Sequence, residues 1–383
     1  MLSFTVTENT TKQPTPLLLG VHVPVCERRQ AKLQLKPFGE PLSPLALLGW
    51  EFLLLQADKS QVPSNLSGQA SSTSFFLLGL PGLEKVQAWL SIPFCFIYAL
   101  ALLGNATLLW VIWTESSLHQ PMYLFLSILA LTDMAMPTCV LPKMLGIFLT
   151  SAQEITFLAC LVQMFMVHAL CAVESGTLTA MAYDRYVAIC DPLNYTILVT
   201  PKTVIKFGAA IFIRAFVIVL PFPFLVQRLP FCHSRRISHT YCEHMALVKL
   251  ACGNTTPNNL YGLILSLLIV GVDLTFIFIS YGLILQAVFQ LPSWEARHKA
   301  LGTCGAHVGV IIILYTPGLF SFLTHRFGHN IPHSVHIFLA NIYLMVPSML
   351  NPIVYGIKTK EIREWLQWTL HLGKRPSRPN KWG

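Results

Sequence analysis

The sequence predicts an all-α membrane protein, built as a bundle of seven transmembrane helices. Two observations support this fold class: the composition is too apolar for a water-soluble domain, and the apolar residues gather into seven long segments. Of the 383 residues, 54% are hydrophobic and 11% are charged, and the mean hydropathy is +0.58. Because a soluble domain carries about 25% charged residues, most of this protein's surface is expected to face lipid.

The apolar segments are long enough to cross a bilayer, which takes about 20 mostly apolar residues in a helix. The seven segments are Trp89–Trp113, Met122–Phe148, Phe157–Cys190, Val204–Val226, Leu260–Leu291, Gly302–Leu323 and Val335–Tyr355. Lys and Arg are more frequent in the short connections and the tail that would face the cytoplasm if the N-terminus lay outside. The positive-inside rule therefore predicts an extracellular N-terminus and a cytoplasmic C-terminus.

The chain divides into three parts. We expect an extracellular tail over residues 1–74, a seven-helix domain over 75–357, and a cytoplasmic tail over 358–383 with a short amphipathic helix. Residues 1–60 are rich in proline and have no apolar period, which predicts disorder. Their apolar run, Leu45–Leu55, is too short to span a bilayer, and an amphipathic segment on the membrane surface is the alternative.

Five Asn-x-Ser/Thr sequons occur in the chain, and such a sequon carries a glycan only where it faces the extracellular side. Asn105 lies inside a predicted span and Asn194 lies in a predicted cytoplasmic loop, so neither is expected to be modified. Asn65, shortly before the first span, is the first candidate for glycosylation, and Asn254 is the second.

Four of the ten cysteines are placed to form disulfides. Cys160 begins the third span, and Cys232, Cys242 and Cys252 lie in the long loop after the fourth span. That loop also contains histidines, but zinc sites favour tight pairs of ligands, and these cysteines are ten residues apart. In an oxidising extracellular space, four cysteines predict two disulfides.

An Asp-Arg pair, Asp184-Arg185, lies at the predicted inner end of the third span. Because arginine stays charged, it must either hold an acid or move to another acceptor. The pair therefore has the properties of a switch. The alternative is an arginine that extends to the membrane interface without a further role.

Further motifs occur in a fixed order along the chain. They are Gly104-Asn105, the segment PMYLFL from Pro121, KALGTC from Lys299 and NPIVY from Asn351. Together with Asp184-Arg185 they resemble the odorant receptor family of rhodopsin-like G-protein-coupled receptors, over about residues 75–370. The segments FLLGLPGLE from Phe76 and HRFG from His325 resemble the class I, fish-like branch. The long N-terminal tail is an extension atypical of the family, and no function is assigned to it.

The resemblance implies a multi-pass plasma-membrane receptor that is not an enzyme and needs no cofactor. It would bind a small volatile odorant in the outer half of the bundle and activate a stimulatory heterotrimeric G protein to raise cAMP. The implied partners are the odorant, the G protein and the lipid bilayer. The net charge of +9 would otherwise suggest an anionic partner, but there is no clustered basic face, so no binding of nucleic acid is expected.

The resemblance also implies roles for individual residues. Cys160 would pair with Cys242, and Cys232 with Cys252. The residues that couple to the G protein or switch conformation would be Asp184, Arg185, Tyr186, Tyr315, Pro317, Asn351, Pro352 and Tyr355. The acids Asp133 and Glu174 lie at mid-membrane depth, where a charge is costly and usually functional. They could hold a sodium ion, or they could form a neutral hydrogen-bonded carboxyl pair.

A candidate ligand site lies on the third span. Met164, His168, Cys171 and Ser175 recur on one helical face, and the resemblance implies that His168 and Arg326 face the pocket. An arginine fork suits a carboxylate, so the predicted ligand is a carboxylic acid or another small aliphatic molecule with a polar head. Phe322 and His244 are expected as walls. Alternatively, His168 is a packing residue and Arg326 stays in water.

Two other classes of function compete with an odorant receptor. A rhodopsin-like receptor for another kind of ligand is the first. A transporter or channel is the second, but the inverted repeats and matching broken helices typical of transporters are not found. An intramembrane enzyme is disfavoured, because neither H-E-x-x-H nor G-x-S-x-G occurs in the sequence.

Overall fold

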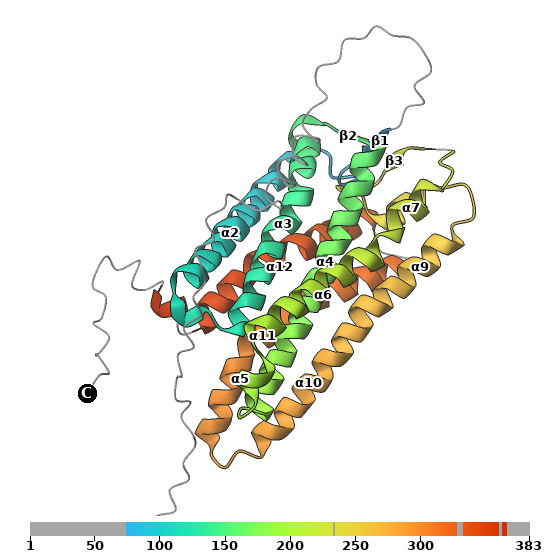
Figure 1. The fold of residues 1–383 in the computed structure, drawn as a ribbon. Helices are drawn as coiled ribbons and strands as arrows, with labels where there is room; N and C mark the ends of the chain where they lie inside the picture. The colour runs from blue at the N-terminus through green and yellow to red at the C-terminus, as the bar shows by residue number, and fades with distance from the viewer. Residues whose placement is uncertain (1–73, 233, 328–331, 360–361, 366–383) are drawn as a thin grey trace, which may run out of the picture. The chain divides into compact units, whose positions relative to one another are not determined.

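A computed structural model describes residues 74–232, 234–327, 332–359 and 362–365, and these form a helical bundle (Figure 1). The tail of residues 1–60 lies outside the described residues. The long helices are α2 (Gln87–Thr114), α3 (Pro121–Thr150), α4 (Phe157–Cys190), α6 (Pro201–Val219), α10 (Val272–Phe289), α11 (Trp294–Phe327) and α12 (His333–Lys358). The shorter ones are η1 (Ser116–Leu118), α5 (Tyr195–Leu198), α7 (Pro221–Gln227), α8 (His244–Val248), α9 (Thr256–Ser266) and the π-turn η2 (Leu267–Gly271).

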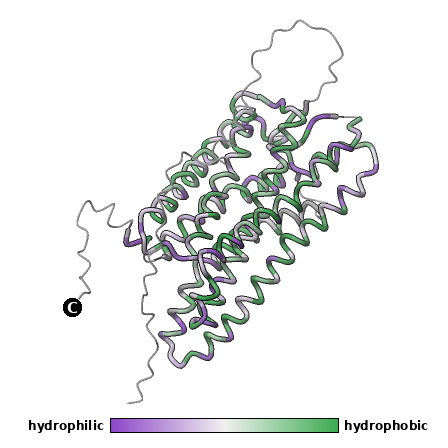
Figure 2. Tube along the Cα trace, viewed as in Figure 1, coloured by the Kyte–Doolittle hydropathy of each residue, from purple (hydrophilic) through white to green (hydrophobic). Residues whose placement is uncertain are grey.

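Within the described residues, six helical segments are long and apolar enough to cross a membrane, and α11 is a seventh that bends by 43° between Gly302 and Cys304. The prediction of an all-α seven-helix bundle is confirmed, with this bent helix counted as one span. Large apolar side chains such as Trp89 and Phe278 point outward and are 73% and 71% exposed. Apolar residues run along the helices while polar residues gather at their ends (Figure 2), as a lipid-facing bundle requires.

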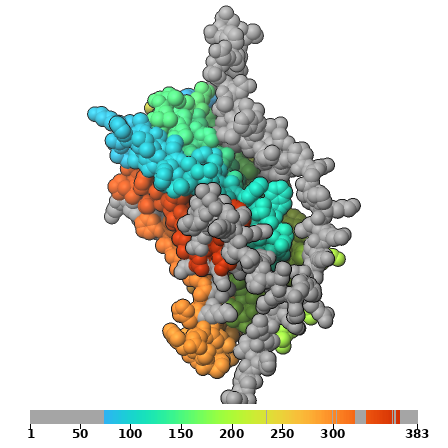
Figure 3. Space-filling view, turned by 90° about the vertical axis from the view of Figure 1, so that its left-hand side faces the viewer, coloured from blue at the N-terminus to red at the C-terminus, as the bar shows by residue number. Residues whose placement is uncertain are grey.

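Helix α4 lies at the centre of the bundle and packs against α3, α6 and α10. On one side, α2 packs against α3 and α12, and α12 in turn packs against α11. Figure 3 shows the surfaces of α2 and α12 meeting on that face. The central position of α4 brings its predicted site residues close to four other helices.

Most of the helices run beyond the predicted spans, and two of the predicted spans are interrupted. The fourth span breaks into α6 and α7 at Pro221, because proline lacks an N–H and its ring clashes with the preceding turn. The fifth span contains the π-turn η2 between α9 and α10. Helix α11 begins at Trp294 rather than at Gly302, because its polar first turns continue the helix past the apolar core.

A small sheet covers one end of the bundle, which we call the lid end. The loop between α7 and α9, residues 228–255, is called the lid. The central strand of the sheet, β1 (Ser74–Leu77), pairs antiparallel with β2 (Glu154–Thr156) and parallel with β3 (Arg236–Ile237). Just after β1, Gly79 has a φ of 76°, and a Cβ there would lie 2.9 Å from the side-chain oxygen of Gln87. Only glycine accepts this conformation readily, so the FLLGLPGLE segment can fasten the start of the bundle to the lid.

Candidate functional site

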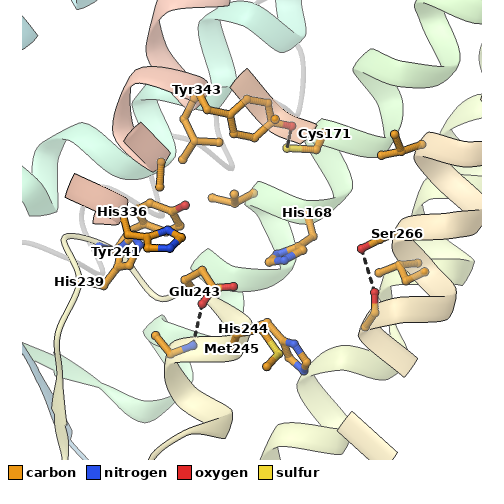
Figure 4. Close-up of a pocket in the computed structure, with 18 of the residues that line it drawn as sticks. His168, Cys171, His239, Tyr241, Glu243, His244, Met245, Ser266, His336 and Tyr343 are labelled. Carbon is orange, nitrogen blue, oxygen red and sulfur yellow. Dashed lines mark hydrogen bonds between the residues drawn. The ribbon is translucent and has the colours of Figure 1, made fainter. Parts of the chain in front are cut away.

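A cavity of about 780 Å³ opens beneath the lid end, between α4, the α9–α10 segment, α11 and α12. Ligand pockets typically measure about 300–1,000 Å³, so this one can enclose a small molecule. Figure 4 shows Tyr343 of α12 beside Cys171 of α4, with His168 of the same helix further along the lining. The lid supplies Tyr241, Glu243 and His244 to the lining.

His168 lies on the cavity wall and is fixed by its own helix. Its Nδ1 is 2.7 Å from the carbonyl oxygen of Met164, and its ring centroid is 5.0 Å from that of Phe222. The side chain of Met164 is fully buried and is not among the described residues that line the cavity. Of the helical face predicted from the sequence, His168, Cys171 and Ser175 line the cavity, whereas Met164 contributes its backbone carbonyl.

His244 begins the short lid helix α8, and its ring centroid is 4.2 Å from that of Phe222. Burial lowers the pKa of His244 to about 4, so this wall of the cavity is neutral at physiological pH. Arg326 and Phe322 belong to the last turns of α11. Their side chains lie outside the described residues, and their roles stay predictions.

The lid is tied down at several points. Disulfides join Cys160 to Cys242 and Cys232 to Cys252, with Cα–Cα distances of 5.4 and 5.9 Å. Gln163 accepts a hydrogen bond from the backbone N–H of Cys242 at 2.9 Å and donates one to a carbonyl of α3. Within the described residues, no three His, Cys, Asp or Glu side chains are placed to hold a metal ion. The four cysteines hold the lid through these two disulfides.

An ion pair inside the bundle was missed by the sequence reasoning. Arg214 of α6 donates hydrogen bonds to both carboxylate oxygens of Asp273 on α10, at 2.6 and 2.7 Å. Asp273 also accepts a 2.6 Å hydrogen bond from Ser175, whose hydroxyl lies 2.6 Å from that of Tyr315 on α11. Gly176 makes this pairing possible, because a Cβ there would lie 2.8 Å from a guanidinium nitrogen of Arg214.

This network joins four helices at the floor of the cavity, since Ser175 and Tyr315 both line it. Tyr315, which was predicted as a switch residue, therefore connects the cavity directly to the ion pair. A signal for the pair was present in the sequence: one cation and one acid, each inside an apolar span. Charges at such depth usually have a partner within the bundle.

The Asp-Arg motif lies at the end of α4 away from the lid. Arg185 forms an ion pair with Asp184, which is fully buried. Tyr195, on the short helix α5, donates a 2.8 Å hydrogen bond to the same carboxylate. Burial and the charge of Asp184 raise the pKa of Tyr195 above its usual value, so this tyrosine keeps its proton. Tyr186, which follows Arg185 in the sequence, is half-buried against the main core.

The two mid-depth acids lie beside the NPIVY segment of α12, which begins at Asn351. The carboxyl groups of Asp133 and Glu174 are both buried and close enough for their charges to interact, and Asn351 donates to both oxygens of Asp133, at 3.1 and 2.9 Å. The side-chain oxygen of Asn351 is buried and has no partner within the described residues. Side-chain oxygen atoms of Asp133 on α3, Glu174 on α4 and Asn351 on α12 therefore lie near one another.

Helix α2 approaches the same part of α12 very closely. A Cβ on Gly104 would lie 2.8 Å from the ring of Pro352, so only glycine fits there without a shift. Asn105 donates a 2.9 Å hydrogen bond to the backbone carbonyl of Ser348. Tyr355 directs its hydroxyl toward the sulfur of Met181 on α4. Pro317 lies inside α11, two residues after Tyr315, where it removes one backbone hydrogen bond.

Of the two candidate glycosylation sites, Asn254 lies within the described residues. Asn254 is exposed at the lid end, in the turn before α9, and its side-chain oxygen accepts a 3.0 Å hydrogen bond from the backbone of Thr256. Its amide nitrogen is therefore accessible for modification. Asn65 lies outside the described residues.

Comparison with known proteins finds similarity to olfactory receptors in every case reported below. The olfactory receptor family profile matches residues 94–372. Olfactory receptor 52D1 of Homo sapiens is 54% identical over 312 residues, which cover 81% of this chain and 98% of that protein. Olfactory receptor 52P1 of Homo sapiens is 56% identical over 290 residues, covering 76% and 90%. Olfactory receptor 52K1 of Homo sapiens is 52% identical over 305 residues, covering 80% and 97%.

Proposed function

The chain belongs to the olfactory receptor family, and we propose that it binds a small volatile ligand in the cavity beneath the lid and activates a stimulatory, olfactory-type G protein. The family consists of multi-pass plasma-membrane receptors and not of enzymes, and relatives numbered in the 52 group fit the class I resemblance. The cavity of about 780 Å³ under a disulfide-tied lid is the observation that supports the proposal.

The proposed orientation places the lid outside the cell. Both disulfides then lie in an oxidising compartment, which stabilises them, and the exposed Asn254 faces the side on which glycans are added. The Asp184-Arg185 end of α4 then lies in the cytoplasm, where the G protein binds. The glycan sites, the two lid bonds and the three-part division of the chain belong to this proposal.

The proposed ligand has one polar head and an aliphatic tail, and a carboxylic acid is the first candidate. His168 would contact the head, and Arg326, on the last turn of α11, would pair with a carboxylate through its guanidinium fork. Cys171, His244 and Phe222 would surround the tail with largely apolar contacts. Met164 acts through its backbone carbonyl, which orients the ring of His168.

Activation would pass from the cavity to the cytoplasmic end through α11. Tyr315 lines the cavity and joins the Arg214–Asp273 ion pair, and Pro317 next to it allows α11 to bend. We propose that Arg185 then leaves Asp184 for the G protein, while Asn351, Pro352 and Tyr355 adjust the packing of α12. Tyr195 and Tyr186 would hold the inactive arrangement around Asp184.

A sodium ion is proposed between Asp133 and Glu174. Both carboxyl groups are buried close to one another, and ionisation of both would leave several oxygens for a cation. The orphaned oxygen of Asn351 fits this role, since a hard cation prefers oxygen ligands. If agonist potency were the same in sodium and in N-methylglucamine buffers, the sodium site would be refuted.

A cAMP reporter assay tests the proposed function. Cells that express the full chain are screened with volatile acids, alcohols and esters, and the best agonist is then tested on Arg326→Ala. A charge-assisted hydrogen bond contributes about 1.5–3 kcal/mol, which corresponds to a rise of roughly ten- to a hundredfold in EC50. An unchanged EC50 at normal surface expression would remove Arg326 from the site.

A further inference from the structure

The hydrogen bond of His168 determines which of its nitrogens carries a proton. A carbonyl oxygen only accepts, so the 2.7 Å contact between Nδ1 and the Met164 carbonyl requires that Nδ1 donates. In a neutral imidazole the other nitrogen, Nε2, is then a bare acceptor. Nε2 lies on the opposite edge of the ring, away from the α4 backbone, and Figure 4 shows this ring directed into the cavity.

Three hydroxyl groups of the cavity lining, those of Ser175, Tyr315 and Tyr343, also donate their hydrogens to partners within the protein. Ser175 donates to Asp273, so Tyr315 must donate to Ser175, and its oxygen presents only lone pairs to the cavity. Tyr343 of α12 donates its hydroxyl hydrogen to the sulfur of Cys171. Glu243 of the lid accepts from the backbone N–H of Ala246 and adds carboxylate oxygens to the lining.

The charged and titratable groups around the cavity of His168 come from the lid, from α11 and from α12. Glu243 and His244 are the lid groups whose charges act on His168. Arg236, His239 and Lys249 of the lid region line the same cavity, as do His333 and His336 of α12. Arg326 keeps its charge at every physiological pH, so it takes up no proton when a ligand binds.

We propose that the polar head of the ligand binds at Nε2 of His168 together with one proton. An alcohol brings its own hydrogen and donates it to the neutral imidazole. A carboxylate has none, so it accepts a hydrogen bond at His168 only when the imidazole takes a proton from solution and Nε2–H becomes the donor. This inference rests on the proposed function, and it makes the response to acids, but not to alcohols, depend on extracellular pH.

The test compares a straight-chain carboxylic acid with the alcohol of the same chain length on cells that express the full chain. One proton taken up per ligand bound raises the acid's EC50 about tenfold between pH 7 and pH 8, while the alcohol's EC50 stays within about twofold. Equal pH dependence for the two ligands would overturn the inference alone. No response to any member of the panel at either pH would overturn the proposed function and this inference with it.

A variant determines where the proton resides. Because dissolved acid also loses its proton as pH rises, the same slope would arise if the ligand carried the proton itself. In His168→Gln the amide donates without titrating, so the acid's EC50 becomes independent of pH. In the control His333→Gln, at the mouth of the cavity, the tenfold slope persists. A slope that persists in His168→Gln would overturn the assignment of the proton to His168.

Discussion

Replacing Asp273 with Asn should destabilise the bundle strongly. Asp273 is 2% exposed, and it is held by two hydrogen bonds from Arg214 and one from Ser175. The amide cannot neutralise the guanidinium, which would stay inside the bundle as an uncompensated charge. Removing one partner of a fully buried pair costs about 3–5 kcal/mol, and the cost here should be smaller because the side chain of Arg214 is 32% exposed.

This cost is measurable as thermal stability in detergent and as the amount of receptor at the cell surface. One kcal/mol shifts Tm by about 2–4 °C in a domain of about 150–250 residues and by less in a longer chain, so Tm should fall by a few degrees. The exposed Glu295→Gln, on the first turn of α11, is a control and should leave Tm nearly unchanged.

The double variant Asp273→Leu with Arg214→Leu separates pairing from packing. Removing both charges leaves no buried unpaired group, so much of the lost stability should return. If Asp273→Asn were as stable as the parent, or if the double variant were no better than the single one, the ion pair would not stabilise the bundle as inferred.

Two further predictions concern the cytoplasmic end and the lid. Arg185→Ala should abolish the cAMP response while the protein still reaches the surface, because the ion pair with buried Asp184 is the proposed switch. A normal cAMP response from a variant expressed at the same level as the parent would refute this role. Cys160→Ser and Cys242→Ser should each lose surface expression, because removing a native disulfide typically costs about 2–5 kcal/mol, whereas Cys95→Ser, a free and exposed cysteine, should not. Non-reducing mass mapping that finds Cys160 free would contradict the pairing.

The helical spans could be predicted from the sequence, because length and apolarity alone decide whether a helix crosses a bilayer. The third predicted span, Phe157–Cys190, has the bounds of α4. The break at Pro221 has a visible cause in the sequence, but whether a proline bends, kinks or divides a helix depends on its neighbours. The early start of α11 could not be predicted from apolarity, because polar residues carry it past the membrane core.

The candidate site could be predicted only in part. Spacing placed Met164 on the same helical face as His168, but the cavity covers a narrower arc of α4, and Met164 is packed away from it. Arg214 and Asp273 are 59 residues apart, and their pairing depends on how α6 and α10 are rotated about their axes. The proton on Nδ1 of His168 follows from a backbone contact that spacing alone does not specify.

A cavity-filling variant tests the central claim, that a small ligand binds beneath the lid, most directly. Ser266 of α9 lines the cavity, whereas Leu268, two residues later, is 49% exposed on the outer surface and is not among the lining residues. The measurement is the EC50 of the best agonist on Ser266→Phe and on the control Leu268→Phe, at matched surface expression. We expect Ser266→Phe to shift the EC50 at least about tenfold, or to abolish the response, and Leu268→Phe to respond like the parent. Parent-like dose–response curves for both variants would contradict binding in this cavity.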